Sequence, residues 1–166
     1  MSRRLEWLIA SEAPAAVLLV RIAVGWVFLS EGIQKFLYPG SLGVGRFEQI
    51  GIPFPDLLAP FVGFFEISCG SLVLAGLLTR LASIPLVITM IVAIVSTTIP
   101  ILLGHGFWGF SLRSLSSYGF WSMAHESRTD LAMLLGALFL AIVGAGRISL
   151  DQRIAWRLSL TDDRST

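Results

Sequence analysis

Arg21 and Glu66 are ionisable residues that lie inside two long apolar stretches of the sequence. If such stretches cross a membrane, a charge at the bilayer centre costs at least about 2.5–3.5 kcal/mol, so it normally has a partner or a task. At about 1.5 Å per helical residue the two residues lie at similar depth. Each also belongs to a stripe on one helix face that contains small residues, which let two membrane helices approach closely. The stripes are Arg21, Gly25, Phe28, Gly32 and Lys35 on the first stretch, and Ala59, Gly63, Glu66 and Gly70 on the second. We therefore predict that Arg21 pairs directly with Glu66.

This pair has two interpretations, and the sequence leaves both open. In one, the ion pair is a brace that holds two helices together. In the other, Glu66 is the best candidate for a catalytic carboxylate that relays a proton or binds a ligand, and Arg21 keeps it charged. Loss of either partner would be costly in both cases, because the remaining buried charge would be uncompensated.

A second group of polar residues is predicted near one end of the apolar stretches. Glu31 and Lys35 are four residues apart with the acid first, which is the favourable order for a helical ion pair. His125 and Glu126 precede the last apolar stretch, and His105 follows the third. Glu31, Lys35, His125 and Glu126 are therefore candidate ligand-binding residues for a quinone head group, with solvated loop residues as the alternative. Their spacing fits no metal-ligand motif, so we predict no metal site.

Arg80 and Asp151 are predicted to form a structural ion pair at the opposite end. Arg80 follows the short turn between the second and third apolar stretches, and Asp151 follows the fourth. Cys69 is the one cysteine of the chain, so an internal disulfide is impossible. The absence of a cysteine pair excludes the disulfide-forming membrane oxidoreductases.

The elements that position these residues follow from the composition. Of 166 residues, 55% are hydrophobic and 14% charged, whereas a soluble domain has about 25% charged residues. Four apolar blocks, at residues 13–33, 57–78, 81–103 and 131–148, are long enough to cross a hydrocarbon core of about 30 Å as helices. We predict an all-α fold, an antiparallel four-helix bundle in which residues 1–166 form a single membrane domain. Residues 157–166 are a polar tail that is expected to fray.

The positive charges predict the orientation of the bundle. Seven lie on one side of the predicted membrane and four on the other, so both termini are expected in the cytoplasm. The first set is Arg3, Arg4, Arg80, Arg147, Arg153, Arg157 and Arg164, and the second is Lys35, Arg46, Arg113 and Arg128. The net charge of +1 and the lack of a basic stripe exclude a nucleic-acid partner.

Several ordered segments resemble the DoxX family of four-helix membrane proteins. They are RIAVGWVFLSEGIQKF at 21–36, FEQIGIPFP at 47–55, FFEISCGSLVLAGLLTRLAS at 64–83 and GAGRISLD at 144–151. The resemblance puts Glu66 at the acidic position of the family's second helix, Arg80 in its Thr-Arg hairpin and Asp151 in its terminal Ser-Leu-Asp. Glu126 matches the acid that precedes the family's fourth span. The insert at residues 104–122 departs from the short form of the family.

The resemblance implies a membrane subunit of a quinone-linked oxidoreductase system in a bacterial inner membrane. The implied partners are the lipid bilayer and either an oxidoreductase subunit or a second copy of the chain. We expect no intrinsic cofactor, only a membrane quinone, and whether the chain is itself an enzyme stays open. Two other functions remain, a non-catalytic scaffold or assembly factor and a carrier of small molecules or ions.

Overall fold

The computed structural model describes residue 11 and residues 13–162, and this part of the chain is helical. The one extended feature there is an isolated bridge between Phe107 and Phe110. The predicted all-α class is therefore confirmed. The helices are α2 (Val17–Leu37), α3 (Val44–Ile50), α4 (Pro55–Ala75), α5 (Thr79–Ala93), the π-helix η1 (Ile94–Thr98), α6 (Ile99–Leu103), α7 (Phe120–Glu126), α8 (Arg128–Val143) and α9 (Leu150–Asp162).

Three helices in the described residues are long and apolar enough to cross a membrane: Val17–Leu37, Pro55–Ala75 and the continuous run Thr79–Leu103. They correspond to the first three predicted spans. The fourth, α8, has 16 residues and is about 24 Å long, which is shorter than the hydrocarbon core of about 30 Å. The predicted end of this span at residue 148 is wrong, because Gly144 has a φ of +86° and ends the helix.

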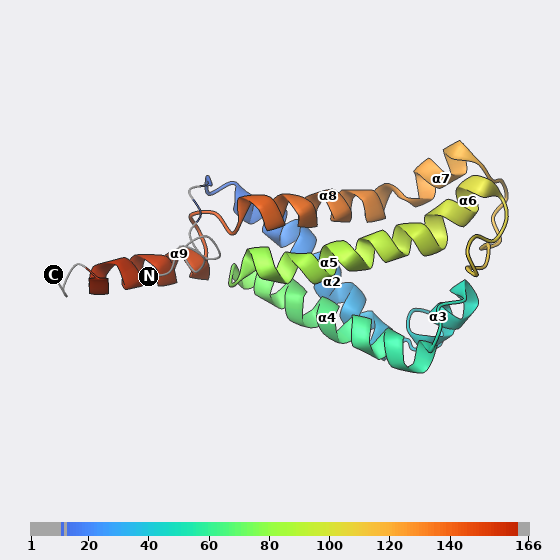
Figure 1. Cartoon of the computed structure of the whole chain (residues 1–166), viewed down its shortest axis with the longest axis horizontal. Coiled ribbons are helices and arrows are strands. Elements are labelled where there is room, and N and C mark those ends of the chain that lie inside the picture. The colour runs from blue at the N-terminus through green and yellow to red at the C-terminus, as the bar shows by residue number, and fades with distance from the viewer. Residues whose placement is uncertain (1–10, 12, 163–166) are drawn as a thin grey trace.

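The bundle consists of two helix pairs, α2 with α4 and α5 with α8. The pairs are joined by the tight α4–α5 turn of Gly76, Leu77 and Leu78, which we call the hairpin end. Gly76 adopts a left-handed φ of +68°, and its N–H and that of Leu77 bond back to the carbonyls of the last turn of α4, a common glycine-based helix end. From there α4 and α5 diverge toward α3, at what we call the α3 end (Figure 1).

Glycines set the contact between α2 and α4. A Cβ added to Gly32 would lie 2.7 Å from the carbonyl oxygen of Gly63, and one added to Gly25 would lie 2.9 Å from that of Gly70. The two backbones thus touch where neither carries a side chain, as small-residue membrane interfaces do. The prediction that the small-residue stripes of the first two spans face each other is confirmed.

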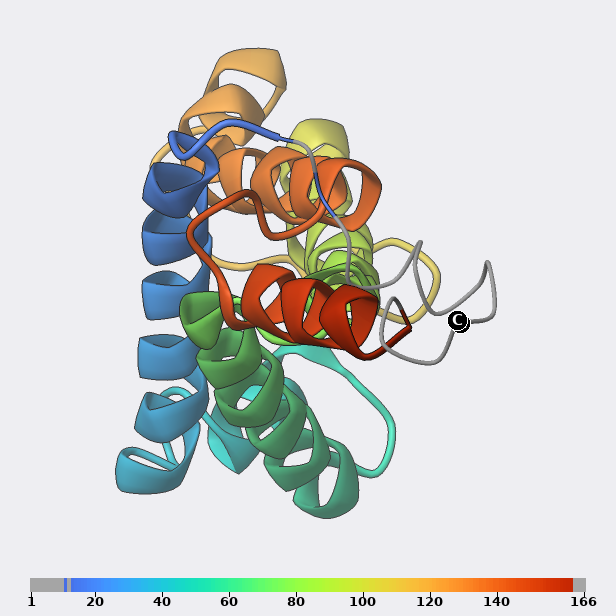
Figure 2. The same ribbon diagram turned by 90° about the vertical axis from the view of Figure 1, so that its left-hand side faces the viewer.

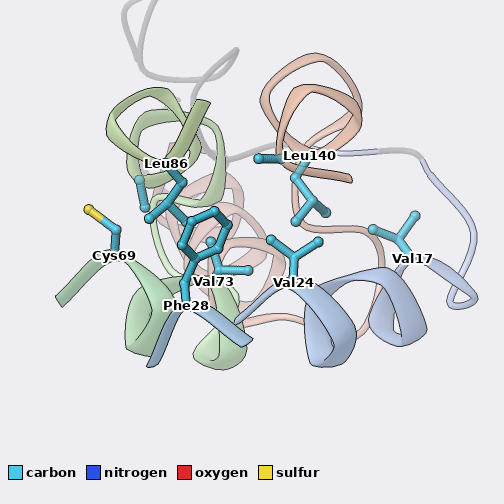
Figure 3. Packing of buried hydrophobic residues seen from close by; sticks show 9 residues of the cluster. Val17, Val24, Phe28, Cys69, Val73, Leu86 and Leu140 are labelled. Atoms are coloured by element: carbon cyan, nitrogen blue, oxygen red, sulfur yellow. The ribbon is translucent and has the colours of Figure 1, made fainter. Parts of the chain in front are cut away.

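The apolar core lies where the two pairs meet, in the half of the bundle nearer the hairpin end. Val24 and Phe28 of α2, Val73 of α4, Leu86 of α5 and Leu140 of α8 are all at most 2% exposed and converge on one another (Figure 3). The two pairs are therefore held together by close packing on this side of the molecule, which fixes the helices that carry the charged residues.

The helix α9 follows α8 at the hairpin end and is seen in front of the bundle in Figure 2. The Ser149 hydroxyl accepts a hydrogen bond from the N–H of Gln152 at 3.1 Å, which is an N-cap that starts a helix. The helix continues to Asp162, and the frayed tail from residue 157 stays a prediction. Residues 163–166, with Arg164, and Arg3 and Arg4 lie outside the described residues, and the orientation in the membrane stays a prediction.

Candidate functional site

A cavity of about 820 Å³ lies between the two helix pairs toward the α3 end. Residues of α2, α3, α4, α5, η1 and α8 line it, and most of them are apolar. Five ionisable side chains are among the lining residues: Glu31, Lys35, Arg46, Glu66 and Asp130. A largely apolar pocket with a few convergent polar groups is the usual form of a small-molecule site.

Two of these charged side chains form a buried ion pair between α2 and α4. Lys35 Nζ lies 2.6 Å from Glu66 Oε2, and the two side chains are 11% and 3% exposed. The predicted pairing of Arg21 with Glu66 is therefore wrong. In the register set by the glycines, Arg21 lies opposite Leu74, eight residues beyond Glu66 along α4 and about 12 Å away along its axis.

Arg21 has a different environment at the hairpin end. Its guanidinium, which is 2% exposed, donates hydrogen bonds to four backbone carbonyls, those of Val73 and Leu74 at the end of α4 and those of Ala145 and Ile148 in the α8–α9 connection. The last carbonyls of a helix have no partner within it and carry its negative dipole end. Arg21 therefore joins α2, α4 and the α8–α9 connection, and its geometry is that of a structural brace.

Asp151 also lies at the hairpin end, where it makes hydrogen bonds that the sequence did not predict. Its carboxylate accepts hydrogen bonds from the N–H groups of Leu78 at 2.7 Å and Thr79 at 3.1 Å, which are free donors at the start of α5. Burial raises the pKa of Asp151, while these N–H groups and the Arg21 charge oppose that rise. Arg80 donates instead to the carbonyl of Val143. The predicted Arg80–Asp151 ion pair is wrong, although both residues lie at this end.

Three further charges surround the ion pair at the α3 end. Glu31 lies one turn before Lys35 on α2, Arg46 is on the short helix α3, and Asp130 is in the first turn of α8. All three residues line the same cavity as Lys35 and Glu66, so these charged groups share one electrostatic environment. The sequence predicted Glu31 and Lys35 as residues of the site, but it did not predict Arg46 and Asp130. Both residues lie in the sequence near the ends of the apolar stretches, where charged residues are common, so their positions did not indicate a site.

His125 and Glu126 are not among the residues that line the cavity. They belong to α7, where His125 lies 2.8 Å from Arg128 and Glu126 pairs with Arg113 at 3.1 Å, both near the surface. His105 Nδ1 lies beside the neighbouring carbonyl of Gly106. The prediction that His125 and Glu126 join Glu31 and Lys35 is therefore wrong, because α7 is a separate short helix beyond the start of α8. Within the described residues, no three His, Cys, Asp or Glu side chains are grouped as a metal would require.

The wall formed by the third span contains the π-helix η1, which the sequence analysis did not predict. Pro100 has no N–H to donate to the carbonyl four residues earlier, and its ring crowds that carbonyl. The wider π turn accommodates this, with the N–H of Ile99 bonded to the carbonyl of Ile94. Ser96 and Thr97, both in η1, line the cavity, and their hydroxyls bond to the carbonyl of Ala93. Single π turns within helices are frequent at functional sites.

The chain is similar to known membrane proteins. The family model described as DoxX matches residues 16–99. The chain is 53% identical over 150 residues to Uncharacterized membrane protein Rv3486 of Mycobacterium tuberculosis, covering 90% of this chain and 88% of that protein. It is 29% identical over 143 residues to Inner membrane protein YphA of Escherichia coli, covering 84% and 91%. No solved structure matches the chain.

These relatives, together with the apolar helices, confirm an integral membrane protein of a bacterium. The matched region contains both long helices of the α2–α4 pair, and with them Lys35 and Glu66. The chain belongs to the DoxX family.

Proposed function

We propose that the cavity binds the head group of a membrane quinone and that the chain is a membrane subunit of a quinone-linked oxidoreductase system. In this proposal α8 completes a four-helix bundle with both termini in the cytoplasm, and a partner subunit supplies or receives the electrons. The observation that carries the proposal is the buried Lys35–Glu66 pair in the wall of a largely apolar cavity of about 820 Å³. Typical ligand sites have volumes of about 300–1,000 Å³.

The donor set of the cavity suits a quinone. Quinone oxygens accept hydrogen bonds, and full reduction takes up two electrons and two protons. Lys35 provides N–H donors, and its side chain is 11% exposed, so the hydrogen bonds that it donates are stronger than in solution. Glu66 can hold a proton for transfer. Burying an ionisable residue inside a membrane costs free energy, so such a residue is a candidate for a function. Glu31 and Asp130 would exchange protons with water at the α3 end.

Quinone binding by the purified protein in lipid nanodiscs tests this proposal. Glu66→Gln keeps the size of the side chain and removes its charge, so the ion pair that orients Lys35 is lost. A hydrogen bond to a charged group contributes about 1.5–3 kcal/mol, so we expect quinone affinity to fall at least about tenfold. Glu126→Gln is the matched control, since it removes the same charge from an exposed pair outside the cavity, and it should bind like the wild type. Unchanged affinity in a folded Glu66→Gln variant would refute the proposal.

A scaffold or assembly factor is the second candidate, and the environment of Arg21 favours it. The most buried cation of the described residues bonds only to backbone carbonyls and braces three segments. If the chain is a scaffold, the Lys35–Glu66 pair is a brace as well. Replacing both residues by Met and Leu would then leave a folded protein that still assembles with its partner. Absence of quinone binding by the wild type would favour this function.

A further inference from the structure

The cavity has a polar opening at the α3 end. Glu31 of α2 and Thr129 of α8 line the cavity, and both residues are exposed. Glu31 lies in the last two turns of α2, about 9 Å from the end of that helix, which is near the membrane–water boundary. Water and protons can therefore reach the charged part of the cavity from this side.

A second, apolar opening lies between α4 and α5. Phe61 of α4 and Ile88 and Val92 of α5 line the cavity, yet they are 55%, 56% and 47% exposed. Ile88 and Val92 are four residues apart and lie on the same face of α5. Counted from the start of α5 they lie about 14 and 20 Å along the third span, well inside a hydrocarbon core of about 30 Å. This opening therefore faces lipid.

The gap between the two helices follows from the architecture. The helix α4 packs mainly along α2, and α5 packs mainly along α8. The helices α4 and α5 are closest to each other at their common turn (Figure 1). They diverge toward the α3 end (Figure 1). In water an apolar gap at mid-helix would tend to close, but in a bilayer it is filled by hydrocarbon chains. The cavity is thus polar toward the boundary and open to hydrocarbon at its side.

We propose that the ligand is an amphipathic lipid whose head lies at the Lys35–Glu66 pair and whose tail leaves between α4 and α5, past Phe61, Ile88 and Val92. This inference rests on the proposed function, in which the head is a quinone and the tail its isoprenoid chain. It adds that the ligand reaches the site from within the bilayer. Because the tail is already in hydrocarbon before it binds, it strengthens binding through packing contacts with these side chains and not through transfer out of water.

The test compares two quinones with the same head, one without a tail and one with a decyl tail. Binding to the full chain in nanodiscs is measured and corrected for partition into empty nanodiscs. Val92→Trp places a bulky side chain in the lateral opening. Ile91→Trp is the matched control, because the neighbouring Ile91 is 49% exposed but does not line the cavity.

We expect the wild type and Ile91→Trp to prefer the decyl quinone by about threefold or more, because the tail gains packing contacts in the opening. Val92→Trp should lose that preference. An unchanged preference in Val92→Trp overturns the lateral route while leaving the proposed function intact. Failure of the wild type to bind either quinone refutes the proposed function itself.

A second measurement needs no substitution and so does not depend on the folding of a variant. A quinone that carries a photoreactive group at the end of its tail is bound to the wild type, cross-linked and located by mass spectrometry. Labelling should fall on α4 and α5 near Phe61, Ile88 and Val92. Labelling of α3 instead would place the tail at the polar end and overturn the inference.

Discussion

The partner of Glu66 is the feature of this protein that a thermodynamic experiment can test most directly. A double-mutant cycle with Lys35→Met and Glu66→Leu measures the coupling between the two residues. The structure joins them by a 2.6 Å ion pair that is nearly inaccessible to solvent. Removing one partner of such a pair costs about 3–5 kcal/mol, because the other charge is left buried, whereas replacing both by apolar residues is often neutral.

The cycle therefore has a large expected coupling. Each single variant should lose about 3–5 kcal/mol of unfolding free energy, while the double variant should lose much less than their sum. We expect a coupling of at least about 3 kcal/mol for Lys35 with Glu66. For Arg21→Met with Glu66→Leu we expect additivity within about 0.5 kcal/mol, since these residues share no contact and are more than about 10 Å apart.

Reversible unfolding in mixed detergent micelles, followed by tryptophan fluorescence, provides the free energies. The exposed pair Arg113–Glu126 is the internal control, and its coupling should lie between about 0.2 and 1 kcal/mol. A coupling of more than about 1 kcal/mol between Arg21 and Glu66 would contradict these contacts. A coupling of less than about 1 kcal/mol between Lys35 and Glu66 would contradict them as well. Either result would mean that the register of α2 against α4 differs from the one described.

Three further predictions concern contacts at the hairpin end and between α2 and α4. Arg21→Lys loses at least one of the four charge-assisted bonds to carbonyls, because an ammonium has three N–H donors, and it should cost about 1.5–3 kcal/mol. Thermal unfolding measures this cost, and a loss below about 1 kcal/mol would contradict the brace. Asp151→Asn replaces one of the two acceptor oxygens by an NH2 group, so one N–H at the start of α5 loses its acceptor and the other keeps only a neutral one. This should cost about 2 kcal/mol in the same assay. Gly32→Ala forces the added Cβ against the Gly63 carbonyl and should cost about 1–3 kcal/mol, whereas Gly40→Ala, with open space around it, should be neutral.

The sequence was sufficient for the features that depend on local composition. Runs of apolar residues predicted three spans at nearly their observed positions, because a helix is the form in which a single segment satisfies its own backbone in lipid. The spacing of Arg21, Gly25, Phe28 and Gly32 identified the face of α2 that meets α4, because side chains three and four residues apart share a face. The motifs also identified the family.

The fourth helix shows where local pattern stops being sufficient. Hydropathy alone extended the predicted fourth helix to residue 148, because Gly144 and Gly146 do not lower the hydropathy enough to end the apolar stretch. In the structure both glycines have positive φ, and the connection turns so that its carbonyls reach Arg21. The end of the helix is thus decided by a contact with a residue far away in the sequence.

The register of the helices was also decided only by the tertiary structure. Eight residues are close to two turns of a helix, so sliding α2 along α4 by that amount presents nearly the same faces and the same stripes. The spacing of residues therefore could not distinguish Arg21 from Lys35 as the partner of Glu66. The contacts of Gly25 and Gly32 with the backbone of α4 fix the offset. Arg46 and Asp130 reach the cavity only because α3 and α8 dock there. The sequence determined which charges are placed in the membrane, and the tertiary packing determined which of them meet.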